Sequence, residues 1–220
     1  MKDIVKQKST LNVIGSTRLS DGIREDLDFY QTPSFATKTL LENFDLKSDC
    51  VWEPMAGNGA ISKEIAKCGY LHVYSSDIVQ RDFPLNKVQD YFSKNWRDNL
   101  WYDMIAYEKN QFAIVTNPPY KIANEFLKFT LEEVRPSTCC VFLPVRYLEG
   151  QKRYDEIFYH YKPAKVLMYV KRLGCYTCKD LEAGIVNERG IGSAVAYMWL
   201  CFDRDTWSEW DTKTELDWIN

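Results

Sequence analysis

Short, almost continuously apolar runs alternate with helix-like stretches along most of this 220-residue chain. A strand that is buried on both faces reads as an unbroken apolar run, whereas a strand with one solvated face alternates between apolar and polar residues. The runs and their spacing predict strands at 51–53, 72–77, 88–90, 112–117, 138–145, 165–170 and 194–202, and helices at 60–67, 122–134 and 151–161. This alternation predicts an α/β fold, in which helices cover both faces of a doubly wound, mostly parallel sheet.

The last two predicted strands are joined by residues 171–193, in which no crossover helix is evident. Parallel neighbours need such a crossover, so we expect these two strands to pair antiparallel at one edge of the sheet. In doubly wound sheets, ligands bind beyond the carboxyl ends of the strands, near the point where the strand order reverses. Candidate functional residues are therefore expected directly after the strands.

The chain divides into a polar N-terminal arm at 1–27, one domain at 28–203 and an acidic tail at 204–220. The tail holds three tryptophans, which we expect to pack it onto the domain or onto a partner subunit. No apolar run is long enough to span a bilayer, and the first residues lack the apolar core of a secretory signal. Seven cysteines, several of them within apolar runs, favour reduced thiols and a cytoplasmic protein.

A glycine-containing turn follows the first predicted strand and leads into a helix. It consists of Glu53, Pro54, Met55, Ala56, Gly57, Asn58 and Gly59. Its glycines let the backbone approach a ligand closely, and the start of the helix offers free N–H groups. Asp77 ends the next strand, where a carboxylate can accept hydrogen bonds from both hydroxyls of a ribose. Together they predict a ribose-containing ligand, without deciding between NAD and S-adenosylmethionine.

The sequence Asn117-Pro118-Pro119-Tyr120 directly follows the apolar strand at 112–117. Two prolines fix the backbone and remove two donors, so the asparagine oxygen and the Pro118 carbonyl could both accept from one NH2 group. That pairing draws the nitrogen lone pair out of conjugation and lets the nitrogen attack an electrophilic methyl group. Tyr120 offers a flat face on which a planar base can stack.

These motifs resemble those of the N6-adenine DNA amino-methyltransferases, and in particular the short, single-domain forms common in phages and prophages. The resemblance covers most of residues 28–203 and includes the stretches 28–33, 142–153 and 170–172. It implies a seven-stranded, Rossmann-like methyltransferase sheet with an antiparallel last strand. The chain departs from the family pattern at Glu53, where aspartate is commoner, and in having no third glycine in the turn.

The resemblance also implies the cofactor and the site. The cofactor is S-adenosyl-L-methionine, and the catalytic motif is Asn117 through Tyr120. The residues that correspond to the family's cofactor-binding motifs are Tyr30, Thr32, Pro33, Glu53, Pro54, Ala56, Gly57, Asn58, Gly59, Asp77, Asp90 and Tyr91. Transfer would be direct, without a covalent intermediate, to an adenine flipped out of the DNA duplex.

A modestly basic middle segment is the candidate surface for the nucleic acid. Residues 121–180 hold eleven Lys and Arg against seven Asp and Glu, although the net charge of the chain is −3. Besides Tyr120, the candidate substrate-binding residues follow predicted strands or open the next helix and are Arg146, Lys152, Arg153, Lys171 and Arg172. They could hold phosphates, although a solvated surface explains them almost as well.

Several alternatives stay open at this stage. The same four-residue motif also serves adenine in RNA and the amide of protein glutamine, and a non-catalytic binding subunit is a further alternative. The chain has no room for a large recognition domain, so we expect relaxed sequence specificity, or recognition by the loop at 171–193, by the N-terminal arm or by a second subunit, for example in a homodimer. Cys175 and Cys178 have the spacing of zinc ligands but lack a second pair, so we expect no metal site.

Overall fold

The computed structural model describes residues 30–96, 111–190, 193–207 and 213–220. The expected arm at 1–27, the start of the domain at residue 28 and Trp210 lie outside these ranges. The strands are β1 (Cys50–Glu53), β2 (His72–Asp77), β3 (Lys87–Val88), β4 (Ala113–Thr116), β5 (Thr138–Pro144), β6 (Lys165–Tyr169), β7 (Tyr197–Asp203) and β8 (Glu215–Ile219). The α-helices are α1 (Ser34–Asn43), α2 (Ala60–Lys67), α5 (Ala123–Phe129), α6 (Gln151–Arg153) and α7 (Cys178–Glu182).

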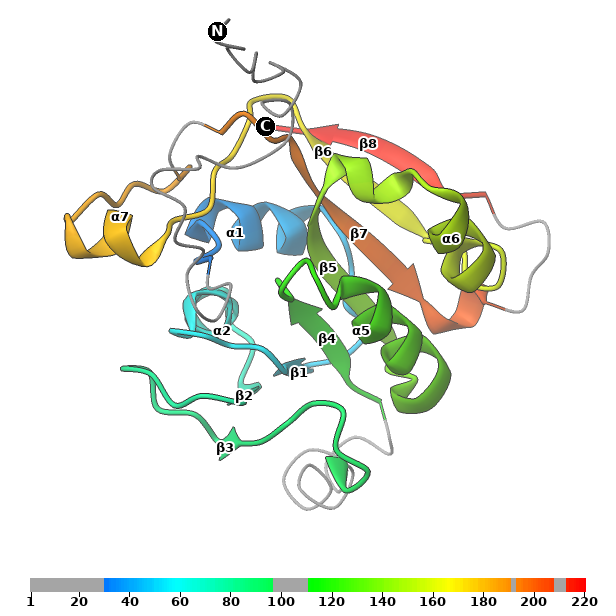
Figure 1. Ribbon diagram of the computed structural model, residues 1–220, viewed down its shortest axis with the longest axis horizontal. Helices are drawn as coiled ribbons and strands as arrows, with labels where there is room; N and C mark the ends of the chain where they lie inside the picture. Colours follow the sequence, from blue (N-terminus) through cyan, green and yellow to red (C-terminus); the bar gives the residue numbers. More distant parts are fainter. Residues whose placement is uncertain (1–29, 97–110, 191–192, 208–212) are drawn as a thin grey trace, which may run out of the picture.

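The described strands form a single sheet in the order β3-β2-β1-β4-β5-β7-β6-β8 (Figure 1). All neighbouring strands pair in parallel except β7, which lies antiparallel between β5 and β6. The predicted fold class, a doubly wound and mostly parallel α/β sheet with an antiparallel strand near one edge, is therefore confirmed. The order reverses between β1 and β4, which is where such a sheet places its ligand.

The sheet has one strand more than expected, because part of the acidic tail joins it. β8 pairs in parallel with β6, with Lys165 opposite Glu215 and Leu167 opposite Asp217. The Lys165 ammonium lies 3.0 Å from the Glu215 carboxylate and 3.3 Å from that of Asp217. These ion pairs fix two of the tail's acidic residues beside the sheet. Trp218 on the same strand is largely exposed, whereas Trp207 packs edge-on against Tyr161.

Three helical expectations are corrected. The segment 171–193, expected as a loop, contains the short helix α7. The helix expected at 122–134 is α5 followed by a wider, π-type turn at Thr130–Val134. The helix expected at 151–161 is α6 with a similar π-type turn at Tyr154–Phe158. In both cases the apolar spacing located the helix correctly. It did not reveal the change from an α-helix to a π-type turn, because the apolar residues stay on the same side of the helix after the change.

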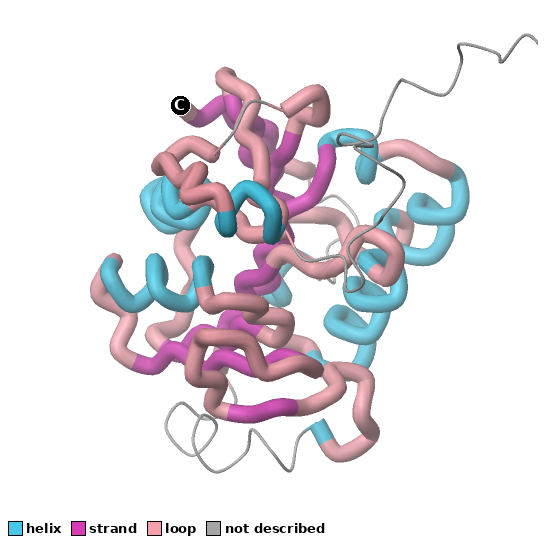
Figure 2. The backbone as a smooth tube through the Cα atoms, turned by 60° about the vertical axis from the view of Figure 1, so that its left-hand side comes forward, coloured by secondary structure: helices cyan, strands magenta, loops and turns pink. Residues whose placement is uncertain are grey.

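Helices cover both faces of the sheet, as Figure 2 shows. α1 and α2 bury Ala36, Leu40, Ile61 and Ile65 in one apolar cluster, and α5 contributes to a second cluster on the opposite face. Adjacent strand residues therefore enter different clusters, which explains why the strands read as continuous apolar runs. Within the described ranges, no helix is both long enough and apolar enough to cross a membrane.

A buried hydrogen-bond network ties α1 to the sheet. The Trp199 indole N–H donates to the Ala36 carbonyl at 2.8 Å and lies 3.0 Å from the Tyr169 hydroxyl. The Tyr169 hydroxyl donates to the same carbonyl at 3.0 Å and lies 2.9 Å from the Thr39 hydroxyl. α1 directly follows the segment around Tyr30, so this network helps to fix that segment over the sheet.

We expect Trp199→Phe to lower the free energy of unfolding by about 2–4 kcal/mol, because it removes the indole donor and leaves a partial cavity. Urea unfolding of the variant and the parent protein measures the difference. Trp218→Phe is the matched control: Trp218 is 64% exposed, and its change should stay within about 0.5 kcal/mol. Equal effects at the two positions would contradict the role given to this network.

Candidate functional site

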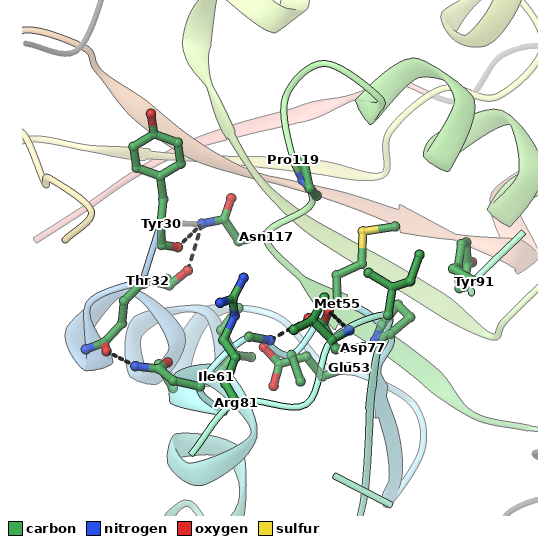
Figure 3. Close-up of a pocket in the computed structure, with 18 of the residues that line it drawn as sticks. Tyr30, Thr32, Glu53, Met55, Ile61, Asp77, Arg81, Tyr91, Asn117 and Pro119 are labelled. Carbon is green, nitrogen blue, oxygen red and sulfur yellow. Dashed lines mark hydrogen bonds between the residues drawn. The ribbon is translucent and has the colours of Figure 1, made fainter. Parts of the chain in front are cut away.

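A cavity of about 250 Å³ lies where β1, β2 and β4 end (Figure 3). Because the carboxyl ends of parallel strands meet at one edge, residues that follow the three strands come together there. The cavity brings together the glycine-containing turn, the acid that ends β2 and the asparagine that follows β4. Its lining is largely apolar, with a few convergent polar groups, which is the usual composition of a small-molecule site.

The glycine-containing turn is held in place by the acid of the next strand. Gly57 has φ +55° and its backbone N–H donates to Asp77 Oδ2 at 2.8 Å. Asp77 Oδ1 accepts from the Val79 N–H at 3.0 Å. Gly59 has φ +72°, and a Cβ atom there would lie 2.4 Å from the Phe83 ring. Gly59 therefore allows Phe83 to pack on the turn.

Glu53 lies at the end of β1 with its carboxyl group fully buried at the base of the cavity. One oxygen accepts from the Ser62 backbone N–H at 2.8 Å and from the Ser62 hydroxyl, which also contacts the Ser75 hydroxyl at 2.6 Å. Burial raises the pKa of Glu53 to about 8, against the opposing effect of the hydrogen bonds from Ser62. Nearby Asp77 raises this pKa further. The Glu53 carboxyl group is therefore mostly protonated at neutral pH.

Asn117 follows β4 and is oriented by hydrogen bonds from its amide nitrogen. Nδ2 donates to the Tyr30 carbonyl at 3.2 Å and to Thr32 Oγ1 at 3.0 Å (Figure 3). A backbone carbonyl can only accept, so the amide must turn its NH2 group toward Tyr30. The Asn117 carbonyl oxygen consequently points away from the 30–32 segment.

Tyr120 lies beside the cavity and does not line it. Its ring stacks on Tyr30, with ring centroids 6.0 Å apart and planes 8° from parallel, and also contacts Tyr197. Its hydroxyl is buried near the Cys175 thiol and the Tyr197 hydroxyl, and burial raises its pKa well above the ordinary value. The Tyr120 ring, on which the sequence predicted that a substrate base stacks, is therefore stacked on Tyr30 in this structure.

The segment before α1 is held by the loop between β6 and β7. Gln31 and Tyr176 form an isolated antiparallel bridge, with N–H to carbonyl distances of 2.9 and 3.0 Å. The Gln31 side chain accepts a hydrogen bond from Asn58 in the glycine-containing turn. Pro33 is buried close to Gly190 of the same loop. Three segments far apart in the sequence thus meet above the carboxyl end of β4.

Most residues predicted for the cofactor line the cavity. They are Tyr30, Thr32, Glu53, Pro54, Ala56, Gly57, Asn58, Asp77, Asp90 and Tyr91, whereas Pro33 and Gly59 support it from behind. Of the predicted catalytic motif, Asn117 and Pro119 line the cavity and Pro118 and Tyr120 do not. The cavity thus brings most of the predicted residues together, and their roles stay predictions.

The cavity also includes residues that were not among the predicted site residues. They are Gln31, Met55, Ala60, Ile61, Ile78, Val79, Arg81, Gln89, Phe92 and Ile122. Most of them lie next to a predicted motif, and proximity alone could have suggested them. Gln89 directly precedes the predicted residue Asp90, whereas Arg81 lies in the segment after β2, where no motif marks it. Figure 3 shows the Arg81 guanidinium extending into the same space as Asp77 and Thr32.

The five basic residues predicted to bind substrate do not line the cavity. Arg146 and Lys171 are exposed and follow β5 and β6, at the same edge of the sheet as the cavity. Lys152 lies 3.8 Å from Glu156, Arg153 packs over Tyr147 at 4.7 Å, and Arg172 donates to the Ala194 carbonyl at 3.3 Å. Their contact with phosphates stays a prediction.

Cys175, one of the two cysteines with zinc-ligand spacing, is buried beside Asn117, with its sulfur 3.8 Å from Asn117 Nδ2. Burial raises the pKa of its thiol to about 12. The side chain of Cys178 lies outside the described part of the chain. Among the described side chains, no group of three or more potential His, Cys, Asp or Glu ligands gathers around one point.

A scan against protein-family models finds no match, and a search of the curated proteins finds none either. Among solved structures, the chain is similar to the type IIG restriction endonuclease BpuSI, with a TM-score of 0.42 and 14% sequence identity. The similarity covers 77% of this chain, and the chain spans 24% of the endonuclease. A likeness of this extent carries no functional argument, so we base the function on the site itself.

The raised pKa of Glu53 predicts a pH-dependent stability. The folded protein keeps this proton to about pH 8, whereas the unfolded chain releases it near 4.5, so stability falls as pH rises between these values. Glu53→Gln lacks the titrating group. The free energy of unfolding of Glu53→Gln, relative to that of the parent protein, should therefore be higher at about pH 8.5 than at about pH 5.

Urea unfolding at the two pH values measures this difference. Glu42→Gln is the matched control, since it is the same substitution at an exposed position on α1. A difference between Glu53→Gln and the parent that does not change with pH would contradict the assignment.

Proposed function

We propose that this protein transfers a methyl group from S-adenosyl-L-methionine to an exocyclic amino nitrogen, namely N6 of adenine in DNA. One observation carries the proposal. The Asn117 amide nitrogen is occupied by Tyr30 and Thr32, which leaves its carbonyl oxygen oriented as an acceptor at the edge of the cavity. An oriented acceptor beside a ribose-type site suits a substrate that presents an NH2 group.

The residues around the cavity fit the proposed cofactor. Both Asp77 carboxylate oxygens accept one backbone N–H each and keep lone pairs for ribose hydroxyls. Phe92 and Ile78 offer apolar surface for an adenine ring. Gln89 Oε1 is buried without a hydrogen-bond partner among the described residues, and the amino group of the cofactor adenine would supply the missing donor.

The chain's own contribution to the reaction would be orientation. S-adenosyl-L-methionine supplies an electrophilic methyl group when it is bound. Asn117 Oδ1 and the Pro118 carbonyl would accept from the two hydrogens of the substrate NH2 group and aim its lone pair at that methyl group. The Pro119 carbonyl accepts from the Ile122 N–H at 3.0 Å, which fixes the turn into α5. The substrate nitrogen would gain the methyl group as the methyl leaves the sulfonium, and the proton that the nitrogen then loses would go to solvent.

The preference for DNA is supported by the setting of the site. Arg146 and Lys171 lie at the edge of the sheet that carries the cavity, where they could contact phosphates. An adenine inside a duplex would have to be flipped out to reach Asn117. To stack on Tyr120, that base would have to displace the Tyr30 ring or use the other face of Tyr120.

We expect the purified protein, incubated with methyl-labelled S-adenosyl-L-methionine and duplex DNA, to form N6-methyladenine. Mass spectrometry of the hydrolysed DNA detects the product. Asn117→Ala should lower the rate by at least about 10²-fold, because it removes an oriented acceptor, and should keep cofactor binding. Asn43→Ala, an exposed asparagine on α1, is the matched control and should keep full activity.

Parallel incubations with RNA and with protein extract separate the alternatives. Label in RNA, or in the side-chain amide of glutamine, would support methylation of an NH2 group but would show that DNA is not the substrate. Cofactor binding without label in any acceptor would favour a non-catalytic subunit.

The proposed contact of Gln89 predicts a loss of cofactor affinity that needs no turnover to measure. Gln89→Met keeps the length of the side chain and removes the acceptor. We expect it to bind S-adenosylhomocysteine, the demethylated product, about 5–10-fold more weakly, as for the loss of one hydrogen bond. Titration calorimetry measures the change, with Gln151→Met on the exposed face of α6 as the control. Unchanged affinity in Gln89→Met would reject this contact.

A further inference from the structure

The antiparallel bridge between Gln31 and Tyr176 gathers several acceptors around one catalytic candidate. Successive side chains of an extended segment point to opposite faces, so the residues before and after a bridged residue share the face that it does not use. Thr32 and Cys175, which flank the bridged pair, therefore lie on one common face. Asn117 lies against that face, with Nδ2 3.0 Å from Thr32 Oγ1 and 3.8 Å from Cys175 Sγ.

The Tyr30 carbonyl completes this set at 3.2 Å from Asn117 Nδ2. The three acceptors come from two segments about 145 residues apart, and the bridge holds them in register. The amide has two N–H bonds, so these acceptors can satisfy both of them. A rotation of the Asn117 amide by 180° would place its oxygen against the Tyr30 carbonyl, where two acceptors repel each other.

We infer that Thr32 and Cys175 are positioning residues for Asn117, which hold its amide so that the carbonyl oxygen faces the substrate. This inference rests on the proposed function. It gives Thr32 a role that differs from the cofactor contact implied by the family resemblance. Thr32 carries the larger share, because a hydroxyl oxygen is a stronger acceptor than a thiol sulfur and lies closer to the amide nitrogen.

Burial strengthens the effect of these contacts. Thr32 is 3% exposed and Cys175 is 8% exposed, so water does not readily replace either acceptor. A buried N–H without a good partner is costly, and removal of Thr32 Oγ1 would leave one Asn117 N–H with only the weak Cys175 acceptor, so the amide would be held less firmly in this orientation. A turned amide would present N–H groups to the substrate NH2 group, and two donors cannot pair.

The test compares Thr32→Val, which keeps the shape of the side chain and removes the acceptor, with Thr32→Ser, which keeps the hydroxyl. Thr32→Val should lower kcat about 10²-fold through misplacement of Asn117. Its affinity for S-adenosylhomocysteine should not change, and Thr32→Ser should recover most of kcat. Cys175→Ala should lose less, up to about tenfold, in line with a weak acceptor.

Thr37→Val is the matched control. Thr37 is fully buried on α1, and its hydroxyl has no hydrogen-bond partner among the described residues. The same substitution there removes a buried hydroxyl without disturbing Asn117, so kcat should stay at the parent value. If Thr32→Val lost cofactor affinity to an extent that explained its loss of rate, Thr32 would be a cofactor contact and the inference would be overturned. An unchanged kcat would overturn it as well.

A second measurement does not depend on turnover. The side-chain NH2 signals of Asn117 are identified in a ¹H–¹⁵N spectrum by their absence in Asn117→Asp. Their hydrogen exchange should be slow in the parent protein and in Thr37→Val, and faster in Thr32→Val. If the parent protein methylates no acceptor, the proposed function fails while this exchange experiment still decides whether Thr32 holds the amide. Equal exchange in all three proteins would overturn the inference.

Discussion

The carboxyl ends of β1, β2 and β4 meet at one edge of the sheet, and the arrangement of the candidate site depends on this constraint. Glu53, Asp77 and Asn117 each lie at or directly after the end of one of these strands. The parallel register of β1 with both neighbours brings them around one cavity although they are separated by up to 64 residues, from 53 to 117. The cavity lies where the strand order reverses, since only there do connections leave in opposite directions.

A second constraint closes the site from above. The bridge between Gln31 and Tyr176 joins the segment before α1 to the loop between β6 and β7, and the hydrogen bond from Asn58 ties that segment to the glycine-containing turn. The cavity therefore has a floor from the sheet and a roof from loops.

Local signals in the sequence were sufficient for every strand except β8, and Asn117 and Asp77 were noticed because they lie at the ends of predicted strands. The cavity residues Tyr30, Thr32, Asp90 and Tyr91 were predicted from the family resemblance. The contact between Cys175 and Asn117 was not foreseen, since it arises from a bridge between distant segments that leaves no periodic pattern. The stacking of Tyr30 on Tyr120 was missed for the same reason. β8 was also missed: the tail was expected to pack on the domain or on a partner subunit, but the acidic Glu215 and Asp217 did not suggest a strand.

The buried Glu53 carboxyl group connects the stability of the fold to the charge of a ligand. Its pKa of about 8 means that the folded protein holds a neutral acid beside the cavity at pH 7, so the ionised form would pay a desolvation cost there. A cation within a few ångströms would offset that cost and lower this pKa. The titration of Glu53, at the end of β1, would therefore report any positive charge that a ligand brings to the base of the cavity.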